Sequence, residues 1–228
     1  MTIHPRPLAA LALLAAAVLV APVSAGGALQ APPNQQRHGR LFPPEDLGLL
    51  ESPDRDVWQK PERIMDSLGI ADGARVADVG AGGGWFTVRL ARRVGPKGVV
   101  YAQDVQPQML EAIERRVAKE NLHNVVTIHG TATDPNLPAD SLDAVLIVET
   151  FHEIQSGNPR LFLENVRRAL KEGGRLGVVD YKRGGGGPGP DGTRPDPAAV
   201  EAVAREAGLR LLERETFLPF QFFLIFSR

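Results

Sequence analysis

Glycines at alternate positions, preceded by an acidic residue, form the part of the sequence best suited to chemistry. The acid is Asp78, and the glycines are Gly80, Gly82 and Gly84. They follow a short apolar run and precede residues with helical periodicity, so we expect a turn from a strand into a helix. Glycine lets a ligand lie against bare backbone, beside the free N–H groups that begin a helix. The turn is therefore a candidate ligand-binding site.

The size of Trp85 discriminates between two ligand classes for this turn. A dinucleotide-binding turn needs a small residue at its sixth position, with its first glycine counted as position one, because its helix and strand pack closely. Counted from Gly80, that position holds Trp85. A nucleotide-dependent oxidoreductase is therefore the less favoured interpretation.

The acid and its three alternate glycines resemble the first motif of class I, Rossmann-like S-adenosylmethionine-dependent methyltransferases. Residues 100–110, which read Val-Tyr-Ala-Gln-Asp-Val-Gln-Pro-Gln-Met-Leu, resemble the second motif of that family. Asp104 follows the turn by about 20 residues, where an acid accepts hydrogen bonds from the ribose of a bound nucleoside. The resemblance implies S-adenosylmethionine as the cofactor, held by the turn and by Asp104.

The resemblance extends the expected cofactor site to two later segments. Residues 130–138 are similar to the family loop that contacts adenine, although the usual acid after the glycine is replaced by Thr131. Asp134 either takes over that acid's role or caps the Asp-Pro turn. Glu149 ends the fourth expected strand, where family members face the methionine part of the cofactor. The predicted cofactor-binding residues are Asp78, Gly80, Ala81, Gly82, Gly84, Asp104, Val105, Thr131, Ala132, Asp134 and Glu149.

A methyl acceptor that reacts through oxygen or nitrogen can need a base to take its proton. His152 and Glu153 follow the fourth expected strand. An unperturbed imidazole has a pKa of about 6.5, so we expect His152 to be the catalytic base and Glu153 to orient it. The alternative is a histidine hydrogen-bonded within its loop, with Glu153 facing solvent. Trp58 and Gln59 are expected to form a lid over the cofactor, and core packing is the alternative for Trp58.

An alternation of helical and strand patterns over residues 55–228 must position these side chains. Short apolar runs predict strands at 75–79, 99–103, 125–129, 142–148 and 175–180. Helical periodicity connects most of them, including a helix that opens at Asn158-Pro159 and ends at Gly173-Gly174. Two further strand-like runs, 209–215 and 219–226, have no helix between them. The pattern predicts an α/β domain with a doubly wound, mostly parallel seven-stranded sheet, its last strand antiparallel, and helices on both faces.

Residues 1–25 differ from the rest of the chain. Arg6 precedes an apolar run from Leu8 to Val20, and Val23-Ser24-Ala25 suits cleavage by a signal peptidase. The run is shorter than the roughly 20 residues that span a bilayer. We expect a cleaved signal peptide and a periplasmic or secreted protein. An uncleaved N-terminal membrane anchor is the alternative.

Two other segments differ in composition from the expected domain. Residues 26–54 are rich in glycine, proline and glutamine, and we expect a linker or an arm that wraps the domain. Residues 184–190 are mostly glycine and proline, and we expect a flexible surface loop there. The methyltransferase-like domain is accordingly expected to span residues 55–228.

Composition excludes several classes of site. The 228 residues carry a net charge of −1, so the chain has no basic footprint for nucleic acid. It contains no cysteine, which excludes disulfides, thiolate metal sites and cysteine nucleophiles. The histidines have no metal-ligand spacing, and no metal is expected.

Two functions fit these expectations. The favoured one is an exported S-adenosylmethionine-dependent methyltransferase that acts on a small-molecule acceptor. The other keeps the fold without catalysis, as a binding protein for S-adenosylmethionine or a nucleoside. Neither involves nucleic acid, and neither touches a membrane except through an uncleaved N-terminus.

Overall fold

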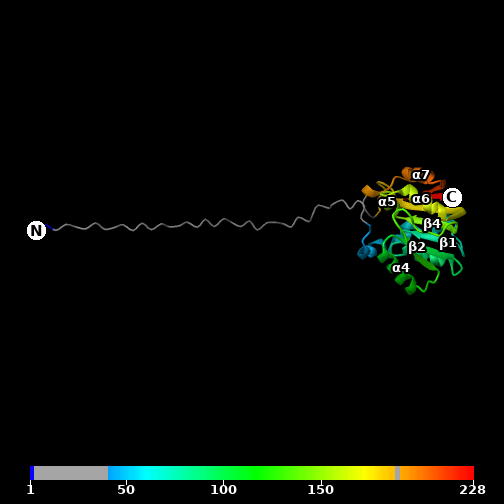
Figure 1. Ribbon diagram of the computed structural model, residues 1–228, viewed down its shortest axis with the longest axis horizontal. Helices are drawn as coiled ribbons and strands as arrows, with labels where there is room; N and C mark the ends of the chain where they lie inside the picture. Colours follow the sequence, from blue (N-terminus) through cyan, green and yellow to red (C-terminus); the bar gives the residue numbers. More distant parts are fainter. Residues whose placement is uncertain (3–40, 188–190) are drawn as a thin grey trace. The chain divides into compact units, whose positions relative to one another are not determined.

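The described part of this computed structural model, residues 1–2, 41–187 and 191–228, contains a mixed sheet of seven strands (Figure 1). The expected signal peptide, and the expected linker as far as residue 40, lie outside the described residues. The strands run in the order β3-β2-β1-β4-β5-β7-β6. Their bounds are β1 Arg75–Val79, β2 Val99–Asp104, β3 Val125–His129, β4 Leu142–Val148, β5 Leu170–Tyr181, β6 Arg210–Glu215 and β7 Gln221–Ser227.

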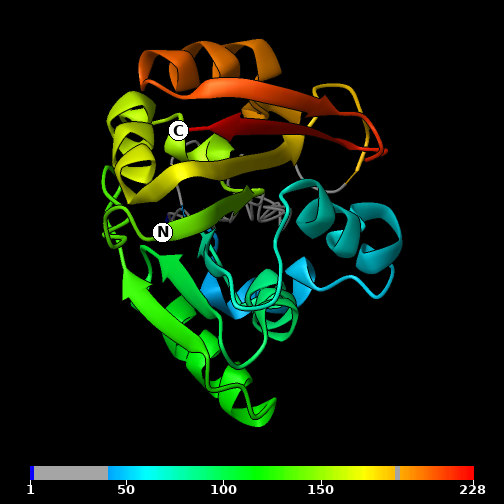
Figure 2. The same cartoon turned by 90° about the vertical axis from the view of Figure 1, so that its right-hand side faces the viewer.

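The direction of β7 confirms the predicted topology. Neighbouring strands from β3 to β5 pair in parallel, whereas β7 pairs antiparallel with both β5 and β6. Figure 2 shows β7 in dark red between β5 in yellow and β6 in orange. A hairpin connection explains this direction, because no crossover helix separates the last two strands.

Helices of the described residues begin where proline favours a start. Proline is the first residue of α2, α4, α6 and α7, a position that needs no backbone N–H. The side chains of Asn158 and Asp196 cap α6 and α7 by accepting from backbone N–H groups. The helices are α1 Arg55–Gln59, α2 Pro61–Ser67, α3 Trp85–Val94, α4 Pro107–Lys119, α5 Phe151–Ile154, α6 Pro159–Ala169 and α7 Pro197–Glu206, with short 3-10 helices η1 Pro44–Leu50 and η2 Asp191–Thr193.

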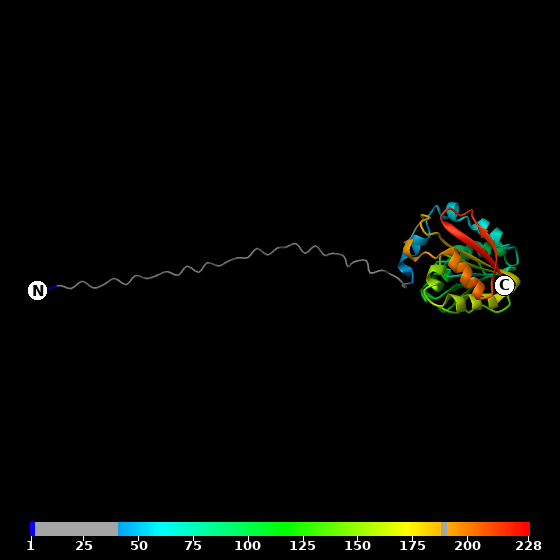
Figure 3. The ribbon, with the colours of Figure 1, turned by 90° about the horizontal axis from the view of Figure 1, so that it is seen from above.

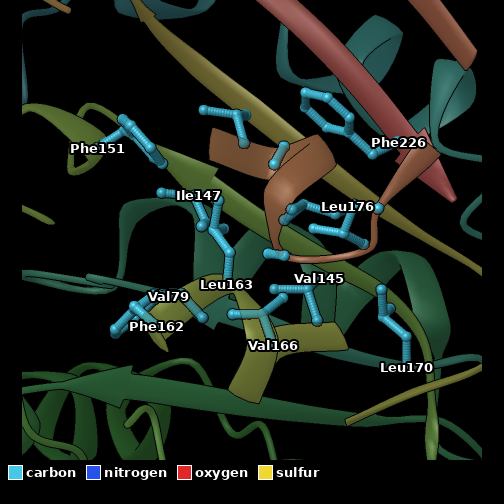
Figure 4. Packing of buried hydrophobic residues seen from close by; sticks show 14 of the residues in the cluster. Val79, Val145, Ile147, Phe151, Phe162, Leu163, Val166, Leu170, Leu176 and Phe226 are labelled. Carbon is cyan, nitrogen blue, oxygen red and sulfur yellow. The ribbon is translucent and has the colours of Figure 1, made fainter. Parts of the chain in front are cut away.

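Alternate residues of the central strands face two hydrophobic clusters. Val145 and Ile147 of β4 point into a cluster with α5, α6 and α7, whereas Leu146 points into a cluster with α2 and α3. Figure 4 shows the first cluster, in which Leu163 of α6 packs against β4. Figure 3 shows helices on either side of the sheet. Burial on both faces explains the nearly continuous apolar sequence of β4.

The boundary between α6 and β5 differs from the prediction. The helix ends at Ala169 instead of Gly173-Gly174, and the strand begins at Leu170 instead of Arg175. Leu170 has extended backbone and pairs with Leu142 of β4, after which the register shifts. The two glycines lie in this irregularity and not in a helix cap. The helices α1 and α5 were also not predicted, because each is too short to show a period.

Part of the segment expected to be a linker or arm lies against the glycine turn. A Cβ on Gly83 would lie 3.2 Å from the side chain of Leu47 in η1. The Gln106 side chain donates to the carbonyl of Phe42, and Glu51 forms an ion pair with Arg116 of α4. Within the described ranges, no helix has the length and apolar character needed to cross a membrane.

Candidate functional site

The chain reverses its direction across the sheet at β1. From β1 it proceeds to β2 and β3 on one side, and it then returns to β4 on the other side. In open α/β sheets, ligands bind outside the carboxyl ends of the strands at such a switch point. The turns that follow β1 and β4 therefore flank the expected binding crevice.

Backbone conformation explains the alternate glycines after β1. Gly80, Gly82 and Gly84 have φ angles of +68°, +53° and +80°, in the left-handed region that residues with a Cβ rarely adopt. Gly80 also needs space, since a Cβ there would lie closer than 3.0 Å to the side chain of Thr150. The N–H of Ala81 donates to the carbonyl of Gln103, at 2.9 Å, and ties the turn to β2.

Trp85 begins α3 directly after the glycine turn. The tryptophan is buried, and the guanidinium groups of Arg55 and Arg89 lie over its ring at 4.3 and 3.5 Å from the centroid. Cations over an aromatic face are attracted by the quadrupole of the ring, whose face is partially negative. Trp85 thus holds α1, which carries Arg55, close to the glycine turn.

Asp104 ends β2 beside the same turn. One carboxylate oxygen accepts from the N–H of Gly82 at 3.0 Å, and the other accepts from the N–H of Gln106 at 2.9 Å. Burial raises the pKa of Asp104, against the lowering effect of these two hydrogen bonds. Each carboxylate oxygen can accept a further hydrogen bond, so the residues present fit a nucleoside ribose.

Asp78 lies beneath the turn and is buried. Its carboxylate accepts a hydrogen bond of 2.6 Å from the hydroxyl of Thr87 in α3. Burial raises the pKa of Asp78 to about 6, although the hydrogen bond from Thr87 and the charge of Arg55 act in the opposite direction. Asp78 therefore links β1 to α3 and remains partly protonated at mildly acidic pH.

The loop after β3 meets the site through its backbone. The N–H of Gly130 donates to the carbonyl of Asp104 at 3.0 Å, which places the exposed Thr131 and Ala132 near the end of β2. The carboxylate of Asp134 accepts from the N–H of Asn136 at 2.8 Å and pairs with Arg168 at 3.2 Å. This is the geometry of the turn-capping alternative. A contact of Asp134 with adenine stays a prediction.

Glu149, directly after β4, is the centre of a buried polar network. Its φ is +53°, and its N–H donates to the carbonyl of Val179 at 2.8 Å. One carboxylate oxygen accepts from the amides of Gln59 and Gln221, at 3.0 and 2.8 Å. Arg55 lies 3.4 Å from the other oxygen. The network connects α1 to the carboxyl end of β4 and to the start of β7.

Sequence reasoning missed Arg55 and Gln221 in this network. Arg55 and Gln59 are one helical turn apart and hydrogen-bond to each other, a spacing that marks one face of a short helix. Gln221 begins a strand whose next five residues are apolar, so its polarity was the available signal. Tyr181 also contacts Glu149, and burial followed by the charge of Glu149 raises the pKa of its phenol.

His152 lies in α5, two residues after Thr150. Its Nδ1 is 3.2 Å from an oxygen of Asp180, and its backbone N–H donates to the same oxygen at 3.1 Å. Burial lowers the pKa of His152, but the hydrogen bond and charge of Asp180, with the charges of Glu153 and Glu149, leave the pKa above its ordinary value. Asp180 thus contacts the ring, whereas the sequence had left Glu153 either to orient the ring or to face solvent.

Glu153 lies in α5 directly after His152, within electrostatic range of Asp104 and Asp180. Burial raises the pKa of Glu153; the charge of His152 lowers it, and those of Asp104 and Asp180 raise it. Its carboxylate has no hydrogen-bond partner among the described residues. The described part of the chain contains no group of three or more acidic or histidine side chains placed to hold a metal ion.

The substitution Asp78→Asn tests the cost of the buried charge. The folded state holds its proton more tightly than the unfolded state, so the wild type loses stability as pH rises from 3.8 to about 6, whereas asparagine does not titrate. We expect the stability of the variant relative to wild type to increase by about 2–3 kcal/mol across that window. Urea unfolding at several pH values measures the difference.

Asp143→Asn provides a control of opposite sign. The pKa of Asp143 is lowered: burial acts to raise it, but hydrogen bonds from Arg75 and Lys171 prevail. Its contribution to stability is therefore complete above the ordinary pKa, and the difference from wild type should be constant between about pH 5 and pH 7. A constant difference for Asp78→Asn as well would contradict the raised pKa.

The sequence of this domain has named relatives. Residues 76–174 match a family described as a methyltransferase domain. The demethylmenaquinone methyltransferase of Geobacillus stearothermophilus is 33% identical over 117 residues, which are 51% of this chain and 48% of that protein. The chain spans about half the length of the curated relatives that it matches.

Solved structures resemble the chain over more of its length. A crystal structure of an S-adenosylmethionine-dependent methyltransferase from Aquifex aeolicus has a TM-score of 0.76 and 29% identity, and the match covers 82% of this chain and 98% of that one. Phosphoethanolamine N-methyltransferase 2 of Haemonchus contortus, solved with S-adenosylmethionine, shares the fold at a TM-score of 0.60 and 17% identity, over 75% of this chain and 52% of its own. The strand order agrees with these matches: residues 76–174 form a methyltransferase domain, and the described domain has the fold of class I, Rossmann-like S-adenosylmethionine-dependent methyltransferases.

Proposed function

We propose that the protein transfers a methyl group from S-adenosylmethionine to a small-molecule acceptor. The observation that carries this proposal is the contact between Thr150 and Gly80, whose carbonyl accepts from the Thr150 hydroxyl at 3.3 Å. The contact joins the cofactor turn to α5, the helix that contains His152 and Glu153. The proposed cofactor-binding turn and the proposed proton-accepting side chain thereby lie at the same edge of the sheet.

The acidic edge of the sheet suits this cofactor. When bound, S-adenosylmethionine supplies a methyl group attached to a positively charged sulfur. Asp104 accepts hydrogen bonds from its ribose, and the backbone of residues 80–84 lies against it. Glu153 contributes negative charge shortly after the end of β4, where it favours a cation over an anion, whereas the charge of Glu149 is paired with that of Arg55. Ala81, Val105, Thr131 and Ala132 complete the proposed cofactor contacts through the loops that carry them.

His152 is proposed as the base of the reaction. Its imidazole is partly exposed, and its ring is held by Asp180 next to the end of β4. A neutral imidazole accepts the proton that an oxygen or nitrogen acceptor releases when it is methylated. The charge of Glu153 acts on the same ring and makes it more basic.

The substitution Asp104→Ala should weaken cofactor binding. The ribose hydroxyls lose a charged acceptor, and such hydrogen bonds contribute about 1.5–3 kcal/mol. Affinity for S-adenosylmethionine should therefore fall about tenfold to a hundredfold. Calorimetry on the purified domain measures this, with circular dichroism to establish that the variant is folded. Asp143→Ala serves as the control. Asp143 lies near the start of β4, at the edge of the sheet opposite to Asp104, so this variant should bind S-adenosylmethionine as the wild type does.

An unchanged affinity in folded Asp104→Ala protein would exclude the proposed cofactor site. Wild-type protein that binds S-adenosylmethionine without turning over any acceptor would instead support the binding-protein alternative. Acceptors are sought by incubating the domain and labelled cofactor with extracts of the cell envelope.

The substitution His152→Ala should reduce turnover of an acceptor found in this way by about 10²–10⁴-fold, the usual effect of removing a positioned base. Cofactor affinity should change little, because the imidazole faces the acceptor. In the wild type the rate should rise with pH through a single group whose pKa lies above 6.5, since only the neutral ring accepts a proton. Normal turnover by the folded variant would assign His152 a structural role.

We also propose that the mature protein lies outside the cytoplasm, because residues 1–25 have the pattern of a signal peptide. Processing should leave an N-terminus near Gly26. Sequencing the N-terminus of the protein from an envelope fraction tests this, and an intact Met1 in the membrane fraction would identify an anchor instead.

A further inference from the structure

We propose that Asp180 is a positioning residue that holds the imidazole of His152 as its Nδ1–H tautomer, so that Nε2 takes the proton of an O–H or N–H methyl acceptor. This inference rests on the proposed function and adds the residue that makes the base competent. It also names the chemical class of the acceptor. No sequence motif indicated Asp180.

Hydrogen-bond chemistry fixes the tautomer. A carboxylate oxygen only accepts, so the nitrogen 3.2 Å from it must carry the hydrogen. That nitrogen is Nδ1, and in a neutral ring the hydrogen is then absent from Nε2. Nε2 has no hydrogen-bond partner among the described residues, and the His152 side chain is 29% exposed. The nitrogen with the free lone pair is therefore the one available to an acceptor.

The carboxylate of Asp180 is itself held in place. The residue is fully buried, and one of its oxygens accepts from the backbone N–H of Tyr181 at 2.8 Å. The other oxygen accepts from both the ring and the backbone N–H of His152. Because β4 and β5 are parallel neighbours, with Val148 beside Val179, the start of α5 lies next to Asp180. Strand pairing thus sets the direction of the ring.

Carboxylates around the ring restrict the acceptor. Asp180, Glu153 and Glu149 all act on His152 and favour its protonated form, against the effect of burial. Glu149 is paired with Arg55, so Asp180 and Glu153 are the charges that disfavour an acceptor arriving as an anion. The acceptor class is therefore an alcohol, a phenol or an amine that keeps its proton until it reacts. The acceptor oxygen or nitrogen bonds to the methyl carbon while its proton passes to Nε2. The bond between that carbon and sulfur breaks, and its electrons stay on sulfur. The partly exposed ring later releases the proton to water.

Nuclear magnetic resonance of protein labelled with ¹⁵N-histidine tests the tautomer without any acceptor. His152→Gln identifies the signals of the ring. We expect hydrogen on Nδ1 and none on Nε2 at a pH above the titration of His152, and a pKa above 6.5. Wild-type protein with the hydrogen on Nε2 would overturn the proposal, whether or not any variant folds.

Asp180→Asn keeps the shape of the side chain and removes its charge. We expect the pKa of His152 to fall and the population of the Nε2–H tautomer to rise. Asp143→Asn makes the same change near the start of β4, far along the sheet from His152. It should leave the pKa and the tautomer of His152 unchanged. A folded Asp180→Asn protein with the wild-type tautomer and pKa would overturn the positioning role.

Calorimetry separates this inference from the proposed function. Asp180→Asn should bind S-adenosylmethionine with wild-type affinity, because Asp180 acts on the acceptor side through His152. If the wild type does not bind the cofactor, the proposed function fails while the tautomer result stands. If the wild type binds and turns over but His152 carries its hydrogen on Nε2, only the role of Asp180 fails.

Discussion

The site depends on the absence of a Cβ at residue 80. Gly80 and Thr150 belong to the two turns that flank the switch point of the sheet, and any larger side chain at residue 80 would separate them. Their contact brings the glycine turn after β1 next to the start of α5 after β4. Packed interiors tolerate little change in such distances. An alanine at this position would therefore disturb the cofactor turn and the start of α5 at once, even though it adds a single carbon.

Buried carboxylates organise the same edge of the sheet. Asp78 binds the hydroxyl of Thr87, Asp104 binds the N–H groups of Gly82 and Gln106, and Asp180 binds those of His152 and Tyr181. A carboxylate removed from water is unfavourable unless hydrogen bonds replace its hydration. Each acid consequently fixes the backbone around it. The same three carboxylates therefore hold the local structure and set the negative charge at this edge of the sheet.

The order of the strands and the cofactor turn could be predicted because their signals are local. Glycines at 80, 82 and 84 indicate a left-handed backbone, and Asp104, about 20 residues later, ends the next strand. The partners of His152 and Glu149 could not be found in this way. Asp180 lies 28 residues from His152, and Arg55 lies 94 residues from Glu149. Only the pairing of β4 with β5, and the packing of α1 over the sheet, bring them together.

The interior position of β7 has a consequence for how the protein is made. Every residue of β7 is buried, and the strand separates β5 from β6, yet it comes after all the other described strands in the sequence. Chains leave the ribosome from their N-terminus. Until residues 221–227 have emerged, one edge of β5 is bare and β6 has no strand beside it. The sheet therefore closes only after all the other described strands have been made.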